Sequence, residues 1–345
     1  MNLEVASPPI EVEKKESPST PEFSVEQLRQ EVPEVFDFDY IKDLLNDGGA
    51  ITEQEFKSLA AKHDGSLEKY LIKYETENGI YYLTRNTNYQ IKPAFDNLSV
   101  VHQALPEGSV PRPVAYSEKL DALAYEELAG ENFVDALVEA DETKRLEFFR
   151  QAGELTKKLH SVDTKDIHRD SNEVNSSIEM IMQTINADSF EEIRAYDPEF
   201  YQGMKAQYDI LVAREKEIRE SEELVINHGD LHPGNLLATD GDNVGMVDFT
   251  DVAIAPRARD VGGFLEQTKG ILEYRNIANE EQFEQYKEAF LEGYGQDMDI
   301  KKEDIDFYQA WQAWRNGMYF ATKIPPDMEG ARATMRGVEQ KLSAL

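Results

Sequence analysis

The stretch HGDLHPGNLL, residues 228–237, begins directly after the apolar run ELVIN and leads into a second run, NLLAT. Its proline and glycine cannot continue a strand, so the pattern predicts a polar loop between two short strands. A third run, VGMVDF, follows the turn-forming TDGDN. If the second and third strands pair in antiparallel fashion, Asn235 and Asp248 lie side by side at one end of the hairpin, with Asp230 close to them.

These three polar side chains together suit phosphoryl transfer. A carboxamide such as Asn235 and a carboxylate such as Asp248 are hard oxygen ligands, which bind Mg²⁺ jointly with water and substrate phosphates. A separate carboxylate, Asp230, can orient a hydroxyl group and accept its proton. An Asp, an Asn after four intervening residues, and a later Asp followed by Phe also make up the catalytic-loop and metal-binding pattern of kinases. The sequence therefore predicts a phosphotransferase site.

The two segments HGDLHPGNLL and MVDFTDVAIAPRARDVGGF resemble the Brenner motif and the metal-binding segment of the aminoglycoside phosphotransferase family, which includes choline, homoserine and fructosamine kinases. The resemblance covers about residues 52–330 and is sharp over 224–265. It implies an α+β, two-lobed, protein-kinase-like fold with an N-terminal antiparallel sheet plus one helix and a larger, mainly helical C-terminal lobe. The activity it implies is Mg²⁺-dependent transfer of the γ-phosphoryl group of ATP or GTP to a hydroxyl of a small-molecule acceptor.

The resemblance also assigns roles in the C-terminal lobe. Asp230 would be the catalytic base, while Asn235 and Asp248 would bind Mg²⁺. Three further residues would support the site: His228 bracing the loop, His232 at the rim near acceptor or phosphates, and Asp260 hydrogen-bonded to the catalytic loop.

In the N-terminal lobe the resemblance is a matter of pattern. DGSLEKY would place Gly65 and Ser66 over the nucleotide phosphates, and YYLTR would place Arg85 where a cation pairs with the α- and β-phosphates. Backbone groups of the hinge AYEELAG, from Glu126 to Leu128, would meet the nucleobase.

Three segments are expected from composition and periodicity. Residues 1–34 hold five of the 14 prolines and are rich in Glu and Ser, which predicts a disordered tail. Residues 35–130 would form the nucleotide-binding lobe, and 131–345 the catalytic and acceptor-binding lobe.

Helices are predicted over 37–47, 52–63 (from a Thr52/Glu55 capping box), 98–105, 141–162, 189–220, 280–294, 303–323 and 327–343. Strands are predicted over 67–75, 79–86 and 122–130, with an extended segment over 110–118.

The net charge of −32 disfavours nucleic acid and anionic membranes as partners and favours a cationic one. Residues 1–40 carry ten acidic and three basic side chains, so the remaining chain still carries −25. The absence of cysteine excludes disulfides and thiolate metal sites. With no leader or membrane-spanning pattern, we expect a cytoplasmic protein; the oligomeric state is left open.

Several alternatives remain open at this level. The acceptor could be an aminoglycoside, or choline, homoserine or a sugar. Because His228, Asp230 and His232 alternate, a metallohydrolase site is a rival interpretation. A nucleotide-binding regulator without catalysis is another, because Leu98 stands where the family has a helix glutamate, with Asp96 as a displaced substitute. Two further sets have simple interpretations: Tyr308, Trp311 and Trp314 as core packing rather than a cation-binding wall, and His63, His102, His160 and His168 as surface or helix-end residues.

Overall fold

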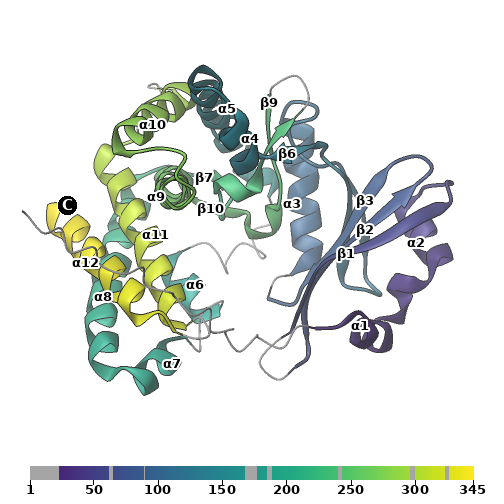
Figure 1. Cartoon of the computed structure of the whole chain (residues 1–345), viewed down its shortest axis with the longest axis horizontal. Coiled ribbons are helices and arrows are strands. Elements are labelled where there is room, and N and C mark those ends of the chain that lie inside the picture. Colours follow the sequence, from purple (N-terminus) through teal and green to yellow (C-terminus); the bar gives the residue numbers. More distant parts are fainter. Residues whose placement is uncertain are drawn as a thin grey trace, which may run out of the picture.

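The computed structural model describes residues 23–61, 65–88, 90–167, 177–184, 189–239, 243–295, 300–322 and 326–345. Figure 1 shows two parts: a twisted sheet with helices α1 and α2 on one side, and a larger helical part on the other. The predicted α+β class, with an antiparallel sheet in the N-terminal lobe and a mainly helical C-terminal lobe, is confirmed.

The N-terminal lobe is built on a five-stranded antiparallel sheet in the order β1-β2-β3-β5-β4. Its elements are α1 (Val25–Glu31), α2 (Phe38–Leu45), β1 (Ile51–Ala61), β2 (Leu67–Thr76), β3 (Ile80–Asn86), α3 (Ile91–Ala104), β4 (Pro113–Ser117) and β5 (Ala122–Glu126). The predicted hairpin around TENG is the β2–β3 pair, and the predicted short helix extends to the whole of α3.

The two faces of this sheet differ because side chains alternate along each strand. One face carries Tyr70, Ile72 and Leu83, which are fully buried in a core with residues of α1 and α2. The opposite face carries Leu71 and Thr84, which line a cavity that also includes residues of the C-terminal lobe. Any nucleotide bound between the lobes must therefore meet this second face.

Two predictions for the N-terminal segment are wrong. Residues 52–63 were expected to be helical, but the described part forms strand β1, because its backbone pairs with β2 from Ile51–Thr76 to Ala61–Leu67. Tertiary pairing thus overrides the local capping signal of Thr52. The expected disordered tail is corrected at its end, since α1 lies within it and buries Leu28. Residues 1–22 lie outside the described part of the chain.

The C-terminal lobe consists of helices around two small antiparallel sheets, ordered β6-β8-β9 and β10-β7. Its first elements are β6 (Gly130–Asn132), α4 (Phe133–Glu139), α5 (Glu142–His160), α6 (Ile178–Thr184), α7 (Ser189–Tyr196), α8 (Pro198–Ser221) and β7 (Leu224–Asn227). The remaining ones are β8 (Leu236–Thr239), β9 (Asn243–Met246), β10 (Ala253–Pro256), α9 (Ala258–Tyr274), α10 (Glu280–Tyr294), α11 (Lys302–Thr322) and α12 (Met328–Ala344).

The helices predicted in this lobe are confirmed, with one division. The segment 189–220 forms two helices, because Asp197 caps α8 and Pro198 occupies its first turn. Tyr308 and Trp314 of α11 are fully buried, as core packing requires. Trp314 packs on Tyr208 with ring centroids 5.7 Å apart. Helix α11 also lies against the loop that follows β7, because its Trp311 lines one slot with Asp230.

Candidate active site

The polar loop after β7 brings the two proposed Mg²⁺ ligands together. A short 3₁₀ turn, Pro233–Asn235, leads into β8, and β8 pairs with β9 so that Leu236 faces Met246. The Val247 N–H donates to the Asn235 carbonyl at 3.0 Å, which extends this pairing to the next residues. The predicted proximity of Asn235 and Asp248 is confirmed, since both line one cavity.

The donor atoms of this pair fit a magnesium ion. The Asn235 side-chain N–H donates to the Asp230 carbonyl at 2.9 Å, which orients the amide and leaves its oxygen without a partner in the described structure. Asp248 has a left-handed backbone, with φ of 63°, and one carboxylate oxygen accepts a hydrogen bond from the Thr250 hydroxyl at 2.8 Å. One amide oxygen and one carboxylate oxygen are the hard donors that Mg²⁺ takes alongside water and phosphates.

Asp260, the first-turn acid of α9, holds the loop in shape. Its carboxylate accepts from the backbone N–H of His228 at 2.6 Å and of Gly229 at 3.0 Å. His160, the last residue of α5, reaches the same carboxylate at 3.2 Å from its Nε2. Burial opposes ionisation, but the hydrogen bond from His160 and the nearby histidine charges outweigh it, so the pKa of Asp260 is lowered.

Gly229 permits the sharp turn of this loop. Its φ is +86°, a conformation that side chains strongly disfavour. A Cβ atom at this position would lie 1.8 Å from the Asp251 carbonyl oxygen, so the loop also packs directly on the chain that follows Asp248. The HGD segment therefore requires glycine for both conformation and space.

The two histidines of the loop are engaged within the protein. His228 is fully buried, donates from Nε2 to the Val247 carbonyl at 2.9 Å, and packs on Phe249. His232 accepts from the Gly234 N–H at 3.0 Å through Nδ1, and its Nε2 lies 3.7 Å from the Asp230 carboxylate. Burial lowers the pKa of His232, against the opposing effect of Asp230. Within the described residues no group of three His, Asp or Glu side chains could hold a metal, so the metallohydrolase interpretation gains no support.

A cavity of about 220 Å³ joins the two lobes at this site. Its walls come from β2, β3, β5, α3 and the segment around Asp248: Lys69, Leu71, Thr84, Leu98, Pro111, Leu123, Tyr125, Asn235, Val247, Asp248, Phe249 and Thr250. The apolar side chains that line the cavity beside Asn235 and Asp248 suit a nucleobase and ribose, with metal-bound phosphates next to them.

The structure does not bring Arg85 to this cavity. Arg85 pairs with Tyr70 across the β3–β2 ladder, so both side chains lie on the face that packs against α1 and α2. This register therefore gives no support to the phosphate role expected for Arg85. The cation that lines the cavity is Lys69 of β2, a half-buried side chain without an ion-pair partner in the described structure.

The helix carboxylate expected near this cation is also missing. Leu98 of α3 lines the cavity, whereas Asp96 forms an ion pair with Lys92 one turn earlier. Residues two positions apart on a helix point to roughly opposite sides, so Asp96 faces away from Lys69. Leu98, rather than a carboxylate, is the α3 residue beside the nucleotide site.

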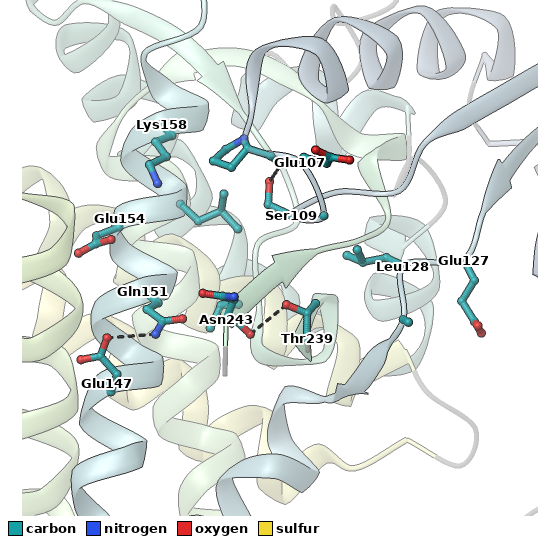
Figure 2. Close-up of a pocket in the computed structure, with 15 residues that line it drawn as sticks. Glu107, Ser109, Glu127, Leu128, Glu147, Gln151, Glu154, Lys158, Thr239 and Asn243 are labelled. Atoms are coloured by element: carbon teal, nitrogen blue, oxygen red, sulfur yellow. Dashed lines mark hydrogen bonds between the residues drawn. The ribbon is translucent and has the colours of Figure 1, made fainter. Parts of the chain in front are cut away.

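The other expected nucleotide contacts lie at the edges of the sheet. Gly65, with φ of +82°, and the exposed Ser66 form the turn that enters β2. The Glu126 carboxylate pairs with Arg112, and the Leu128 side chain lines a different cavity, so only hinge backbone atoms are available to a nucleobase. That larger cavity, about 660 Å³, is lined by Glu107, Glu127, Glu154 and Lys158 among others and contains none of the proposed catalytic side chains (Figure 2).

The profile of the phosphotransferase enzyme family matches residues 61–308, more than half of the sequence. The chain belongs to this family. No curated protein sequence matches it.

Solved structures share the fold of this phosphotransferase family member at low sequence identity. The streptomycin–ATP complex of the phosphotransferase APH(2")-IIa has a TM-score of 0.59 and 10% identity, over 88% of this chain and 95% of that one. Ethanolamine kinase from Plasmodium vivax has a TM-score of 0.56 and 15% identity, over 88% and 84%. Choline kinase LicA from Streptococcus pneumoniae has a TM-score of 0.53 and 14% identity, over 91% and 99%. The kinase-like fold is thereby confirmed.

Three residues of this phosphotransferase site were not identified from the sequence. His160 was expected at the surface or at a helix end; it does end α5, but it is buried against Asp260 and Tyr294. His63 and His168 lie outside the described residues, and His102 is half-buried on α3. The alternation in LEKYLIKYE places Lys69 and Leu71 on the same face of a strand, so Lys69 could have been identified from the sequence. Arg315 belongs to a helix that the sequence predicts, but no local pattern shows that it lines one slot with Asp230.

In the described part of the phosphotransferase chain, no helix has the length and apolarity needed to span a lipid bilayer.

Proposed function

We propose that the protein is a kinase that transfers the γ-phosphoryl group of ATP or GTP to a hydroxyl of a small molecule. The observation that carries this proposal is the arrangement around one loop. Asn235 and Asp248 line the cavity between the lobes, while Asp230 lines a separate slot on the other side of the same loop. A nucleotide and an acceptor can thus approach the loop from different sides.

In the proposed reaction Asp230 orients the acceptor hydroxyl. The acceptor oxygen bonds to the γ-phosphorus, the bond from that phosphorus to the β,γ-bridging oxygen breaks, and the nucleoside diphosphate leaves. The hydroxyl proton passes to the Asp230 carboxylate, whose side chain is about one third exposed, at 38%. Asp260 fixes the loop backbone, which keeps Asp230 at a constant position relative to Asn235.

On the nucleotide side, Asn235 and Asp248 would hold Mg²⁺, which supplies charge neutralisation for the phosphates. Lys69 would add a second positive charge from β2, in the place originally expected for Arg85. The turn at Gly65 and Ser66 would cover the phosphates, and the backbone from Glu126 to Leu128 would face the nucleobase.

A coupled assay of nucleoside diphosphate release tests this proposal. It is run with ATP and GTP over a panel of amino alcohols, aminoglycosides, hydroxy acids and sugars. Replacing Asp230 by Asn should lower turnover about 100- to 10,000-fold, the usual contribution of a general base, while nucleotide binding persists. Near-normal turnover in this variant would exclude the role of Asp230. Tight nucleotide binding with no transfer to any acceptor would indicate a non-catalytic regulator instead.

A further inference from the structure

The slot beside Asp230 contains two arginine side chains, although the negative charge of the whole chain favours a cationic acceptor. It lies between the catalytic loop, α9 and α11, two helices that run next to each other in Figure 1. Its lining is Gly229, Asp230, Leu231, Arg259, Asp260, Gly263, Gln267, Trp311, Gln312 and Arg315. Two arginines and two glutamines thus surround the carboxylate that would activate the acceptor.

The carboxylates of the slot offer little to a cationic acceptor. Asp260 is buried and already accepts hydrogen bonds from two backbone N–H groups and from His160. Asp230 is the group assigned to the reacting hydroxyl. A positively charged acceptor would therefore find no further carboxylate on the lining and would meet the charge of Arg315.

The two arginines differ in their partners. Arg259 is buried, and the largest favourable charge near it is Glu215, which balances its guanidinium within the core. Arg315 is half-buried and, among the described residues, forms one hydrogen bond, to the Gln312 side-chain oxygen at 3.4 Å. No carboxylate in the described structure lies within ion-pair distance of Arg315, although the whole chain has 68 acidic and 36 basic residues.

Arg315 also lies close to the reacting groups. It lines the same slot as Asp230, and His232 lies 3.7 Å from the Asp230 carboxylate. Only about 10 Å³ of the slot is free, and its floor of Trp311 and Gln312 is buried. An acceptor that reaches the Asp230 carboxylate would therefore approach from its exposed side, where Arg315 is also partly exposed.

We propose that the acceptor is an alcohol bearing an anionic group, a carboxylate or a phosphate, and that Arg315 binds this group while the hydroxyl faces Asp230. This inference rests on the proposed kinase function and refines its substrate class. A guanidinium binds planar and tetrahedral oxyanions through two N–H groups, and the half-buried amide of Gln267 suits a neighbouring hydroxyl. Arg315 is thus a specificity-determining residue, and the large negative charge of the chain is unrelated to the acceptor.

The test compares small polyhydroxy acceptors of related structure that carry different charges. Glycerate, glycerol phosphate, glycerol and 2-amino-1,3-propanediol form one set, and the pyranoses glucuronate, glucose and glucosamine form another. Binding to the full chain, saturated with Mg²⁺ and a non-hydrolysable nucleotide, is measured by calorimetry, and transfer is measured with ATP or GTP. We expect an anionic member of each set to bind best and to have the highest kcat/KM. The comparison of glycerate with glycerol phosphate shows whether the site prefers a carboxylate or a phosphate.

Replacing Arg315 by Gln should weaken binding of the preferred anion about 10- to 100-fold and abolish its advantage over the neutral member. Arg315→Lys should restore part of it. Arg336, an exposed arginine on α12 outside the slot, provides the matched control Arg336→Gln, which removes the same charge and should leave the preference intact. Circular dichroism and the melting temperature identify folded variants.

Preference for the cationic member, equal binding across a set, or no binding by any member would overturn the inference about Arg315. These outcomes are separate from failure of the kinase function, which would show as no binding of Mg²⁺-nucleotide and no release of nucleoside diphosphate under any condition.

Discussion

At the scale of single residues, Gly229 occupies a position that no other amino acid fits without strain. Replacing it by Ala combines a disfavoured φ of +86° with a Cβ atom 1.8 Å from the Asp251 carbonyl. The backbone conformation alone costs about 1–2 kcal/mol, and relieving the overlap must move the loop that carries Asp230. We expect a lower melting temperature. We also expect turnover to fall at temperatures where the variant is still folded, because the loop that carries Asp230 has moved.

The matched control for Gly229 is Gly337 on α12, where an added Cβ meets no atom within 4 Å and φ is not positive. Gly337→Ala should stabilise the protein by up to about 1 kcal/mol through helix propensity. Thermal unfolding and turnover of both variants provide the comparison. Equal behaviour of the two alanine variants would show that the turn at Gly229 is not required.

The placement of two residues of this site was predictable because it depends on local order in the sequence. Asn235 and Asp248 stand at a spacing that an antiparallel hairpin converts into proximity, and the β8–β9 pairing does so. His160 belongs to a different class. It lies 100 positions before Asp260, and only the packing of α5 beside α9 brings the two side chains together. No local pattern in the sequence reports such a contact.

At the scale of elements, the register of β2 and β3 decides which cation faces the nucleotide cavity. The sequence identified both strands, but a cationic residue in YYLTR gave no sign of the face it would occupy. Arg85 shares a face with Tyr70, while Lys69 shares the cavity face with Leu71. A shift of one position moves a side chain to the other side of a sheet, so strand identification alone cannot place a ligand.

This register gives a paired prediction. Lys69→Met should raise the Kd for Mg²⁺-nucleotide about 10-fold or more, because a charge-assisted hydrogen bond to phosphate contributes about 1.5–3 kcal/mol. Arg85→Met changes the same charge on the opposite face and should leave that Kd within about twofold. Calorimetric titration of both variants decides the matter. The reverse ranking would restore the original interpretation of Arg85.

Strand β1 shows a second limit of local patterns. Its sequence TEQEFKSLAA has helical spacing and a capping signal, but β1 is the edge strand next to β2, with exposed Glu53 and Glu55. Charged side chains on an edge strand discourage pairing with another molecule. The same charged residues therefore suit both the exposed face of a helix and the edge strand of a sheet. Only the pairing with β2 determines that this segment is a strand.

The hairpin β2–β3 is tied to the preceding helix by Asp47. Its carboxylate accepts from Gly49 N–H at 2.8 Å, from the Thr76 hydroxyl at 2.6 Å, and from the Asn78 amide. The hydrogen bond from Thr76 is the largest cause that lowers the pKa of Asp47 to about 2. A group whose pKa falls on folding stabilises the folded state above its unfolded pKa, near 3.8, and loses that effect as pH falls towards 2.

We therefore expect Asp47→Ala to lower the free energy of unfolding by about 2 kcal/mol at neutral pH, with a difference from wild type that is already smaller at pH 3. Urea unfolding at pH 7 and at pH 3 measures both values. A difference that stays constant over this range would mean that the carboxylate charge of Asp47 contributes nothing.

At the scale of the whole molecule, the described residues form two separate apolar cores. One lies between the N-terminal sheet and helices α1 and α2, and the other runs from α3 through the C-terminal lobe. The cavity that contains Asp248 is bounded by Leu71 and Thr84 from the sheet and by Val247 and Phe249 from the second lobe. A nucleotide bound there contacts both lobes and should stabilise them together.

We accordingly predict that Mg²⁺ with ATP or GTP raises the melting temperature of the full chain and sharpens its transition. A ligand at 100 times its Kd adds about 2.7 kcal/mol to the stability of the folded state. Asp248→Asn, which keeps the size of the side chain but removes its charge, should lose most of this gain, and a chelator should remove it from wild type. Asp251→Asn, which alters an acid three residues further along, is the control. If Asp248→Asn retained the full Mg²⁺-dependent gain, the metal would have to be held elsewhere, because Asp248 is the sole carboxylate among the described residues that line the cavity.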